Sequence, residues 1–275
     1  MNHSELISFL GKYKTQPKKS LSQTFLTDLN VLQKIIQTAQ VGANDTVLEI
    51  GPGPGSLTTL LLNTGCRVIA IEKDAILADA LHRIQTNDER LTTINNDALA
   101  VDLTQWTPSK VVANLPYHIT ARLMGVLMPL QIPSYTLMVQ KEVGERVKGS
   151  PKSKNYSALT LFCQYYTNIT ATFIVKASSF YPQPKVDSMV LHLQSKTTPL
   201  ADPAPFFALV RKAFQKRRKM LTTSLGNKEI GKWLTDIGCS PQARPEELDL
   251  TQWLYIFEKY RRTFSNQVIS TASSA

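Results

Sequence analysis

Cysteine is scarce in this sequence. Only three occur among 275 residues, and none belongs to a CxxC pair: Cys66, Cys163 and Cys239. An odd and widely spaced set argues against a disulfide framework and against a structural zinc site, and it is typical of a reducing compartment. The four histidines also lack the spacing of metal ligands, so the sequence predicts no metal site.

Long apolar runs are also missing. No run reaches the ~18 residues that a membrane helix needs, and the start, MNHSELISFLGKYK, lacks the apolar stretch and flanks of a signal peptide. The chain has no internal repeat and no GKS or GKT sequence that would mark a P-loop. Because 43% of the residues are hydrophobic, the chain can bury a sizeable core. We therefore expect a soluble, cytoplasmic, globular protein without a membrane partner.

Acidic residues are fewer than basic ones, and the two kinds are segregated. The 31 Lys and Arg against 21 Asp and Glu give a net charge of +10. Residues 27–140 hold seven basic and ten acidic residues, whereas residues 141–199 hold eight against three and residues 200–275 hold twelve against seven. Many soluble proteins are simply basic, but an excess confined to the flanks favours contact of those flanks with a nucleic acid.

Short β-rich runs alternate with helical patterns through the middle of the chain, which is typical of a parallel α/β sheet. Seven strands are predicted, at residues 46–50, 67–71, 91–94, 110–113, 135–139, 170–175 and 187–194. Helices are predicted at residues 28–38, 56–63, 75–83, 119–128 and 156–166. The last strand alternates apolar and polar residues, so we expect it to be an antiparallel edge strand.

The end of the chain is predicted to be helical. A proline-rich linker at residues 195–205 precedes helical patterns at residues 206–225, 228–238, 245–249 and 251–264, and the last eleven residues have the composition of a frayed tail.

A glycine loop, Gly51-Pro52-Gly53-Pro54-Gly55, follows the first strand of the sheet and leads into a helix. Glycines let the backbone turn tightly and let a ligand approach the main chain. The spacing is G-x-G-x-G and not the phosphate-binding G-x-G-x-x-G. By itself the loop could be an ordinary strand-to-helix turn.

Two carboxylates strengthen the ligand interpretation. Glu72 ends the next strand, where it could accept hydrogen bonds from both ribose hydroxyls of a nucleoside cofactor, and Asp97 follows the third strand, where it suits an adenine amine. Since no pyrophosphate-binding spacing is present, the set favours S-adenosylmethionine over NAD. Glu49 would hold the loop or meet the cofactor ammonium through water.

The fourth strand is followed by Asn114-Leu115-Pro116-Tyr117. The N6 amine of adenine is a poor nucleophile because its lone pair is delocalised. The Asn114 side-chain oxygen and a backbone carbonyl such as that of Leu115 could accept its two hydrogens and direct the lone pair toward a methyl group. Pro116 would fix that backbone, and Tyr117 offers an aromatic face for an unstacked base. A strand-end turn with a core tyrosine is the alternative for this motif alone.

Together these motifs resemble those of the rRNA adenine N6-dimethyltransferases, over about residues 18–260. The similarity includes SLSQTFL (20–26), VLEIGPGPGSLT (47–58), FYPQPKVDS (180–188), FQKRRKML (214–221) and RPEEL (244–248). It is greatest to the members that modify two adjacent adenines near the 3′ end of small-subunit (16S) rRNA. The resemblance implies a class I, Rossmann-like methyltransferase fold with a seven-stranded, mostly parallel sheet and a small all-α carboxyl-terminal domain.

The resemblance also implies domain and site assignments. The domains would be a basic arm with a cofactor-contact segment (1–26), a methyltransferase domain (27–199) and a helical RNA-binding domain (200–275). Phe180 would form a second aromatic wall for the target base, although a hydrophobic plug before a strand is an equal alternative. Thr24 stands where the family usually has Asn, so its contact is through a shorter side chain or the backbone. Cofactor contacts would fall on Thr24, Leu26, Gly51, Glu72, Asp97 and Asn114.

Three basic segments are candidates for RNA contact. The first is a predicted helix with four consecutive cations, and the second is a loop after the fifth strand, expected to be mobile, that also holds Lys141, Arg146 and Lys154. The third is the amino-terminal arm with Lys12, Lys14, Lys18 and Lys19. The phosphate-contact candidates are Arg211, Lys212, Lys216, Arg217, Arg218, Lys219, Lys148 and Lys152.

The sequence thus predicts a monomeric enzyme that dimethylates adenines of small-subunit rRNA. Two alternatives remain open: an Erm-like methyltransferase of large-subunit (23S) rRNA, and a catalytically silent RNA-binding assembly factor on the same fold.

Overall fold

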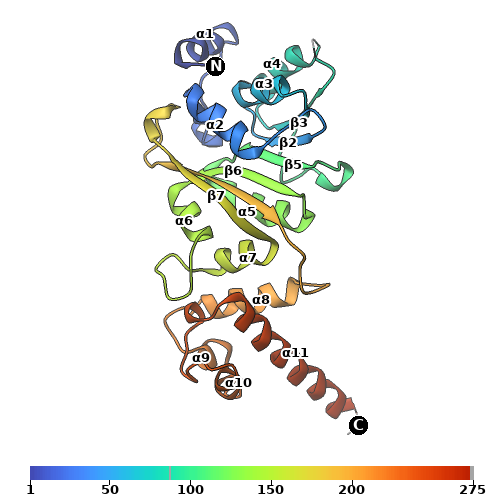
Figure 1. Ribbon diagram of the computed structural model, residues 1–275, viewed down its shortest axis with the longest axis vertical. Helices are drawn as coiled ribbons and strands as arrows, with labels where there is room; N and C mark the ends of the chain where they lie inside the picture. The colour runs from blue at the N-terminus through green and yellow to red at the C-terminus, as the bar shows by residue number, and fades with distance from the viewer. Residues whose placement is uncertain (87, 273–275) are drawn as a thin grey trace. The chain divides into compact units, whose positions relative to one another are not determined.

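The computed structural model describes residues 1–86 and 88–272, and the chain forms two compact units (Figure 1). The first comprises Met1–Gly144 and Tyr166–Lys196, and the second comprises Glu145–Tyr165 and Thr197–Ala275. These units differ from the domains expected from sequence, because residues 145–165 cluster with the carboxyl-terminal helices. The sequence does not reveal that residues 145–165 belong to the second unit, because the helix at 156–166 has the same pattern as any other helix of an α/β domain.

The first unit is built on a seven-stranded sheet in the order β4-β3-β2-β5-β6-β9-β7. All neighbours from β4 to β6 pair in parallel, and β9 pairs antiparallel with both β6 and β7. The predicted seven-stranded, mostly parallel sheet is therefore confirmed. Its strands are β2 (Thr46–Ile50), β3 (Arg67–Glu72), β4 (Leu91–Asn95), β5 (Lys110–Asn114), β6 (Ser134–Gln140), β7 (Thr167–Val175) and β9 (Ser188–Ser195).

One strand assignment is wrong. β9, predicted at the edge of the sheet, lies between β6 and β7, and β7 forms the edge. All residues from Ser188 to Leu193 are buried, so β9 is covered on both faces. The apparent alternation was misleading because the intervening Val190 and His192 are buried as well.

Helices α2 (Leu29–Ala39) and α3 (Ser56–Asn63) pack against one face of the sheet. Their apolar side chains share a core cluster with Val47 of β2, Val68 of β3 and Val112 of β5. Two further helices, α4 (Ala75–Gln85) and α5 (Thr120–Leu127), follow β3 and β5. These helices and the hydrophobic strands form the layered α/β arrangement that the alternating sequence pattern predicted.

The amino-terminal segment contains a helix that the expectation of a basic arm missed. Helix α1 (His3–Lys12) begins with a capping box between Asn2 and Glu5, and its Leu6 and Leu10 are buried in a cluster with Leu77 of α4. A short 3-10 helix (Lys19–Leu21) and strand β1 (Phe25–Leu26) follow, and β1 pairs antiparallel with β8 (Phe180–Tyr181). The apolar spacing of Leu6 and Leu10 was the overlooked helix signal.

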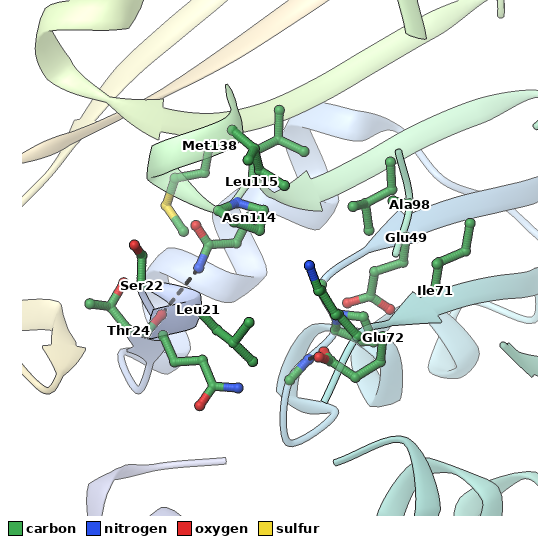
Figure 2. A pocket seen from close by; sticks show the side chains of 18 of the residues that line it. Leu21, Ser22, Thr24, Glu49, Ile71, Glu72, Ala98, Asn114, Leu115 and Met138 are labelled. Atoms are coloured by element: carbon green, nitrogen blue, oxygen red, sulfur yellow. Dashed lines mark hydrogen bonds between the residues drawn. The ribbon is translucent and has the colours of Figure 1, made fainter. Parts of the chain in front are cut away.

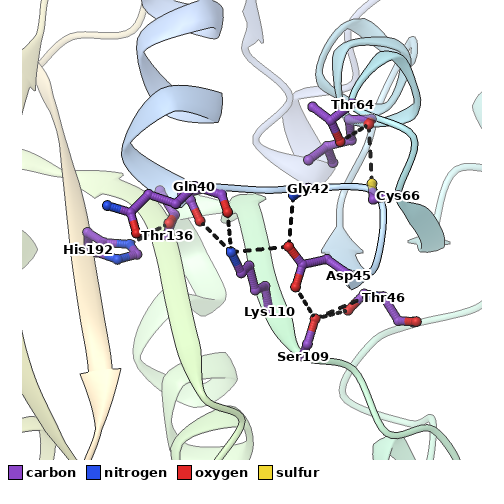
Figure 3. A network of polar contacts seen from close by, with 12 residues as sticks. Gln40, Gly42, Asp45, Thr46, Thr64, Cys66, Ser109, Lys110, Thr136 and His192 are labelled. Carbon is purple, nitrogen blue, oxygen red and sulfur yellow. Dashed lines mark hydrogen bonds and ion pairs between the residues drawn. The ribbon is translucent and has the colours of Figure 1, made fainter.

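A polar network ties the amino ends of the central strands to α2 (Figure 3). The Lys110 ammonium at the start of β5 lies 3.2 Å from Asp45 and donates to the carbonyls of Ala39 and Gln40, where α2 ends. The hydroxyl of Ser109 donates to Asp45 at 2.7 Å. This network also supplies a cation at the carboxyl end of a helix, where the helix dipole favours one.

The second unit is helical, with a core of aromatic side chains that includes Phe206, Phe207, Phe257 and Trp253. A carboxyl-terminal helical region is thereby confirmed. Helix α6 (Lys141–Val147) spans the boundary between the units, so Lys141 and Arg146 are helical and not part of a loop. The other elements are α7 (Ala158–Tyr166), α8 (Ala204–Phe214), α9 (Leu221–Leu225), α10 (Ile230–Asp236), a 3-10 turn (Pro245–Glu247) and α11 (Leu250–Ala272).

Two predictions in this unit are wrong, one for a helix and one for the carboxyl-terminal tail. The predicted helix 206–225 is interrupted, because α8 ends at Phe214 and the four consecutive cations form the turn before α9. Mutual repulsion of four adjacent charges and the hydrogen bonds of the Ser224 hydroxyl to the carbonyls of Lys216 and Met220 favour that turn. The expected tail from Ser265 is instead helical as far as Ala272, and residues 273–275 lie outside the described part.

Within residues 1–86 and 88–272, no helix is both long and apolar enough to cross a membrane. The same described residues hold no group of three or more His, Cys, Asp or Glu side chains that could bind a metal ion. Cys66, Cys163 and Cys239 are all free thiols, and burial raises the pKa of Cys163 to about 12.

Candidate active site

A cavity of about 280 Å³ opens at the carboxyl ends of β2, β3 and β5. The chain runs from β2 outward to β4 and then crosses to β5 on the other side of β2, so the cavity lies where the strand order reverses. Open α/β sheets bind ligands at such a point. In Figure 2, Asn114, Thr24 and Met138 lie on one side of the cavity and Glu49, Glu72 and Ile71 lie on the other.

The glycine loop forms one wall. Gly51, Gly53 and Gly55 have φ values of +68°, +60° and +88°, which side chains rarely adopt. A Cβ at Gly53 would also lie 3.1 Å from the Phe25 ring of the amino-terminal segment. The glycines therefore serve both the tight turn and the close approach of β1 to the loop.

Glu72 holds this loop through its carboxylate. It is the last residue of β3, is 6% exposed, and accepts hydrogen bonds from the amides of Gly53 at 2.9 Å and Asp74 at 2.8 Å. Burial raises the pKa of Glu72, and these amide donors oppose the rise. Each carboxylate oxygen can accept a further bond, so Glu72 remains able to receive ligand hydroxyls.

Asp97 lies at the rim of the same cavity. Its carboxylate forms a 2.8 Å ion pair with Lys73 and accepts the Leu99 amide at 2.9 Å. The hydrogen bond from Lys73 is the main reason why the pKa of Asp97 is lowered. Asp97 is therefore an ionised acceptor beside the cavity.

Two side chains in the cavity wall carry buried oxygens that have no hydrogen-bond partner among the described residues. In Glu49 the two carboxylate oxygens are unpaired, and in Asn114 the amide oxygen is unpaired. Such an atom costs about 1–3 kcal/mol when it stays unsatisfied, so its presence in a ligand-sized cavity points to a ligand donor. Burial raises the pKa of Glu49 to about 8, and the nearby Glu72 charge adds to the rise.

The amino-terminal segment orients Asn114. The Asn114 amide nitrogen donates to the Thr24 carbonyl at 3.4 Å, which leaves its oxygen free for another donor. Thr24 thus reaches the site through its backbone, where Asn and Thr are equivalent. The amide of Leu115 donates to the Met138 carbonyl at 3.0 Å, so the strand-end turn is held against β6.

Tyr117 lines the cavity, and its hydroxyl lies 2.7 Å from the Ser188 hydroxyl at the start of β9. Ser188 is fully buried. Sequence reasoning included Ser188 in a motif but gave it no role, because only the folded sheet brings residues 117 and 188 together.

Phe180 lies in the hydrophobic core, and its role as a second aromatic wall stays a prediction. It is 4% exposed in the hydrophobic core beside Leu26, and the cavity is lined without it. β8 pairs with β1, and the pairing of Phe180 with Leu26 directs the ring into the core. The plug alternative fits this placement.

The segment before β1 is fastened over the cavity by Asp74, which sequence reasoning missed. Asp74 is 2% exposed and accepts hydrogen bonds from the Lys18 ammonium and the Gln23 amide, both at 2.9 Å. It also caps α4 through the Ile76 amide. An aspartate directly before a predicted helix was the available signal.

The donor and acceptor set fits S-adenosylmethionine. The cavity combines acceptors suited to an ammonium, ribose hydroxyls and an adenine amine with an apolar lining and a glycine wall. Of the expected cofactor contacts, the cavity brings together all six: Thr24, Leu26, Gly51, Glu72, Asp97 and Asn114. Leu115, Pro116 and Tyr117 of the motif line it too.

The amino-terminal lysines and Lys141 lie in the first unit, whereas the eight phosphate-contact candidates all lie in the second unit. Seven of them are exposed, whereas Arg217 is half-buried. Arg211 and Lys212 are in the last turn of α8, and Lys148 and Lys152 lie between α6 and α7.

Comparisons with known proteins point to one family. The family model described as "Ribosomal RNA adenine dimethylase" matches residues 14–262. A protein named Ribosomal RNA small subunit methyltransferase A from Protochlamydia amoebophila is 40% identical over 271 residues, covering 93% of this chain and 95% of its own. Its namesake from Chlamydia muridarum is 38% identical over 264 residues, covering 92% and 95%.

Solved structures agree. A dimethyladenosine transferase from Plasmodium falciparum has a TM-score of 0.76 and 26% identity, with 86% of this chain and 98% of that chain covered. The 23S rRNA methyltransferase ErmE has a TM-score of 0.66 and 25% identity, with 85% and 98% covered.

Proposed function

The chain belongs to the ribosomal RNA adenine dimethylase family, and on that premise we propose that it dimethylates N6 of two adjacent adenines near the 3′ end of small-subunit rRNA. It is an S-adenosylmethionine-dependent rRNA methyltransferase. Two methyl groups on each of two adenines make four transfers, so the site must accept a monomethylated amine as well as a primary one.

The observation that carries the proposal is the unpaired, buried amide oxygen of Asn114. A primary amine that enters the cavity offers a hydrogen to this oxygen and a second hydrogen to a backbone carbonyl of the same turn, such as that of Leu115. Both bonds draw the nitrogen out of conjugation with the ring and direct its lone pair. No strong general base is required, because the nitrogen becomes acidic only as it attacks and its proton can leave late.

The residues of the cavity position the reactants. Bound S-adenosylmethionine supplies a methyl group made electrophilic by its sulfonium. Glu72 and Asp97 would accept hydrogen bonds from the ribose and the adenine of the cofactor, and Gly51, Leu26 and the Thr24 backbone would form the wall around it. Tyr117 stacks on the target base, Pro116 fixes the turn, and the rate depends mainly on alignment of the amine with the methyl group.

The partner is the small ribosomal subunit, and the enzyme acts as a monomer in the cytoplasm. Exposed cations of the second unit contact rRNA phosphates: Arg211, Lys212, Lys216, Arg218, Lys219, Lys148 and Lys152. The net charge of +10 supports association with a polyanion.

The test is incubation of the protein with labelled S-adenosylmethionine and undermethylated small subunits, followed by nucleoside analysis of digested RNA. We expect N6,N6-dimethyladenosine. Purified large subunits form the matched substrate control, because the similarity to ErmE makes 23S rRNA the competing target. Methylation of large subunits alone would replace the proposal with the Erm-like activity, and binding without methylation of either would indicate an assembly factor.

A further inference from the structure

The segment Arg244–Leu248 forms the centre of a hydrogen-bond network in the second unit. The Glu246 carboxylate pairs with the Arg217 guanidinium, and the Glu246 carbonyl accepts the Lys152 amide at 2.8 Å. The Leu248 carbonyl accepts the Tyr156 hydroxyl at 2.6 Å. One short segment therefore contacts both the turn after α8 and the chain between α6 and α7.

Arg217 completes this connection. Its remaining two guanidinium nitrogens donate to the carbonyls of Ser153 and Lys154, each at 3.0 Å. All three guanidinium nitrogens of Arg217 thus donate to acceptors within the protein, and its side chain is 34% exposed. The neighbouring Lys216, Arg218 and Lys219 are exposed.

We propose that Arg217 and Glu246 form a clamp that assembles two separate basic segments into one rRNA phosphate-binding surface, and that Arg217 acts as a positioning residue and not as a phosphate contact. The surface consists of Lys148, Lys152 and Lys154 from one segment and Lys216, Arg218 and Lys219 from the other. The inference rests on the proposed function, since it takes rRNA as the ligand.

The backbone at Lys152 supports the clamp. Lys152 has a φ of +69°, a conformation that residues other than glycine rarely adopt. The bond from its amide to Glu246, together with the Arg217 bonds to the next two carbonyls, holds that conformation. Without the clamp, this loop would lose the geometry that spaces its three lysines.

The experiment separates a clamp from a phosphate contact by using full-length variants and small-subunit rRNA. Arg217→Lys keeps the charge but cannot bridge a carboxylate and two carbonyls. Glu246→Ala removes a negative charge, so electrostatics alone would tighten RNA binding. The clamp predicts that both variants bind rRNA about tenfold more weakly in filter binding, because several phosphate contacts are lost together.

Arg218→Lys and Arg218→Gln are the matched controls on the adjacent exposed arginine. Arg218→Lys should bind nearly as well as the wild type, and Arg218→Gln should lower the salt slope by about one phosphate contact. Limited trypsin digestion without RNA gives a second readout. Arg217→Lys and Glu246→Ala should speed cleavage after Lys152 and Lys154, whereas both Arg218 variants should not.

Unchanged or tighter rRNA binding by Glu246→Ala, or wild-type trypsin protection in Arg217→Lys, would overturn the clamp. Failure of the wild type to bind small-subunit rRNA would also overturn the proposal that these cations form an rRNA-binding surface. If the wild type binds this RNA without methylating it, the proposed function fails while the clamp is still decided by the variants.

Discussion

Polar groups at the two ends of β2 and β5 differ in whether they have hydrogen-bond partners. β2 and β5 begin in the network of Lys110 and end at the cavity that contains Asn114 (Figures 2 and 3). At the beginning, the Lys110 ammonium is paired with Asp45 and with two carbonyls of α2. At the other end, oxygens of Glu49 and Asn114 are buried without a partner among the described residues.

This difference separates stability from function within one sheet. Satisfied polar groups at the amino edge contribute to folding, whereas unpaired ones at the carboxyl edge oppose it until a ligand offers donors. Variants at the two edges should therefore have opposite consequences. Substitutions at the cavity should impair catalysis without loss of stability, and substitutions in the network should do the reverse.

Asn114→Ala should give the largest effect. Loss of the Asn114 amide oxygen should slow methyl transfer at least about 10³-fold, because amine orientation is lost. S-adenosylmethionine affinity should stay measurable by calorimetry, and the unfolding midpoint should not fall. Complete loss of cofactor binding would make Asn114 a binding residue and would contradict its catalytic role.

Glu49→Gln should stabilise the protein without cofactor. The carboxyl group titrates near 4.5 in the unfolded chain and near 8 in the folded one, so between these pH values the folded state holds more protons. Wild-type stability therefore falls as pH rises from about 4.5 to about 8, and the variant should be about 3 kcal/mol more stable at pH 7. Urea unfolding at pH 5 and pH 8 measures this; an equal difference at both would contradict it.

Lys110→Met should act in the opposite direction. It leaves Asp45 without its cation and two helix carbonyls without their donor, which should reduce the free energy of unfolding by about 2 kcal/mol. Chemical denaturation compares it with Lys185→Met, a substitution of an exposed lysine in the same unit. The rate of methyl transfer per folded molecule should be unchanged. A slower rate at low temperature, where the variant is folded, would contradict the idea that the amino edge serves stability alone.

Ser188→Ala should give the smallest effect. The Ser188 hydroxyl aligns the Tyr117 ring through one 2.7 Å hydrogen bond, so its loss should lower kcat by roughly threefold to tenfold. Tyr117→Phe keeps the aromatic face and removes the same hydrogen bond, so its kcat should fall by the same factor. The double variant should be no slower than either single variant. Additive losses would show that the two hydroxyls act independently.

Local sequence signals located most of the site. Glycines that need positive φ, a carboxylate at the end of β3 and the motif after β5 all line the cavity, since parallel strands bring their carboxyl ends to one edge. The burial of Phe180 could not be foreseen, because its direction depends on the pairing of β8 with β1. The prediction of one continuous helix over residues 206–225 was wrong, because charge repulsion and the hydrogen bonds of Ser224 outweighed helix propensity at residues 215–220.

The amino-acid sequence by itself determined the α/β alternation, the glycine loop after β2, the motif after β5 and the segregation of charge, since each depends on spacing along a few neighbouring residues. Tertiary structure alone decided that β9 is internal, that Ser188 meets Tyr117, and that Arg217 bonds to Glu246 and to two loop carbonyls. Each of these depends on contacts between separate elements of the chain: Tyr117 and Ser188 are 71 positions apart, and Arg217 and Glu246 are 29 apart. No local pattern encodes such a contact, because its energy exists only when the fold brings both partners together.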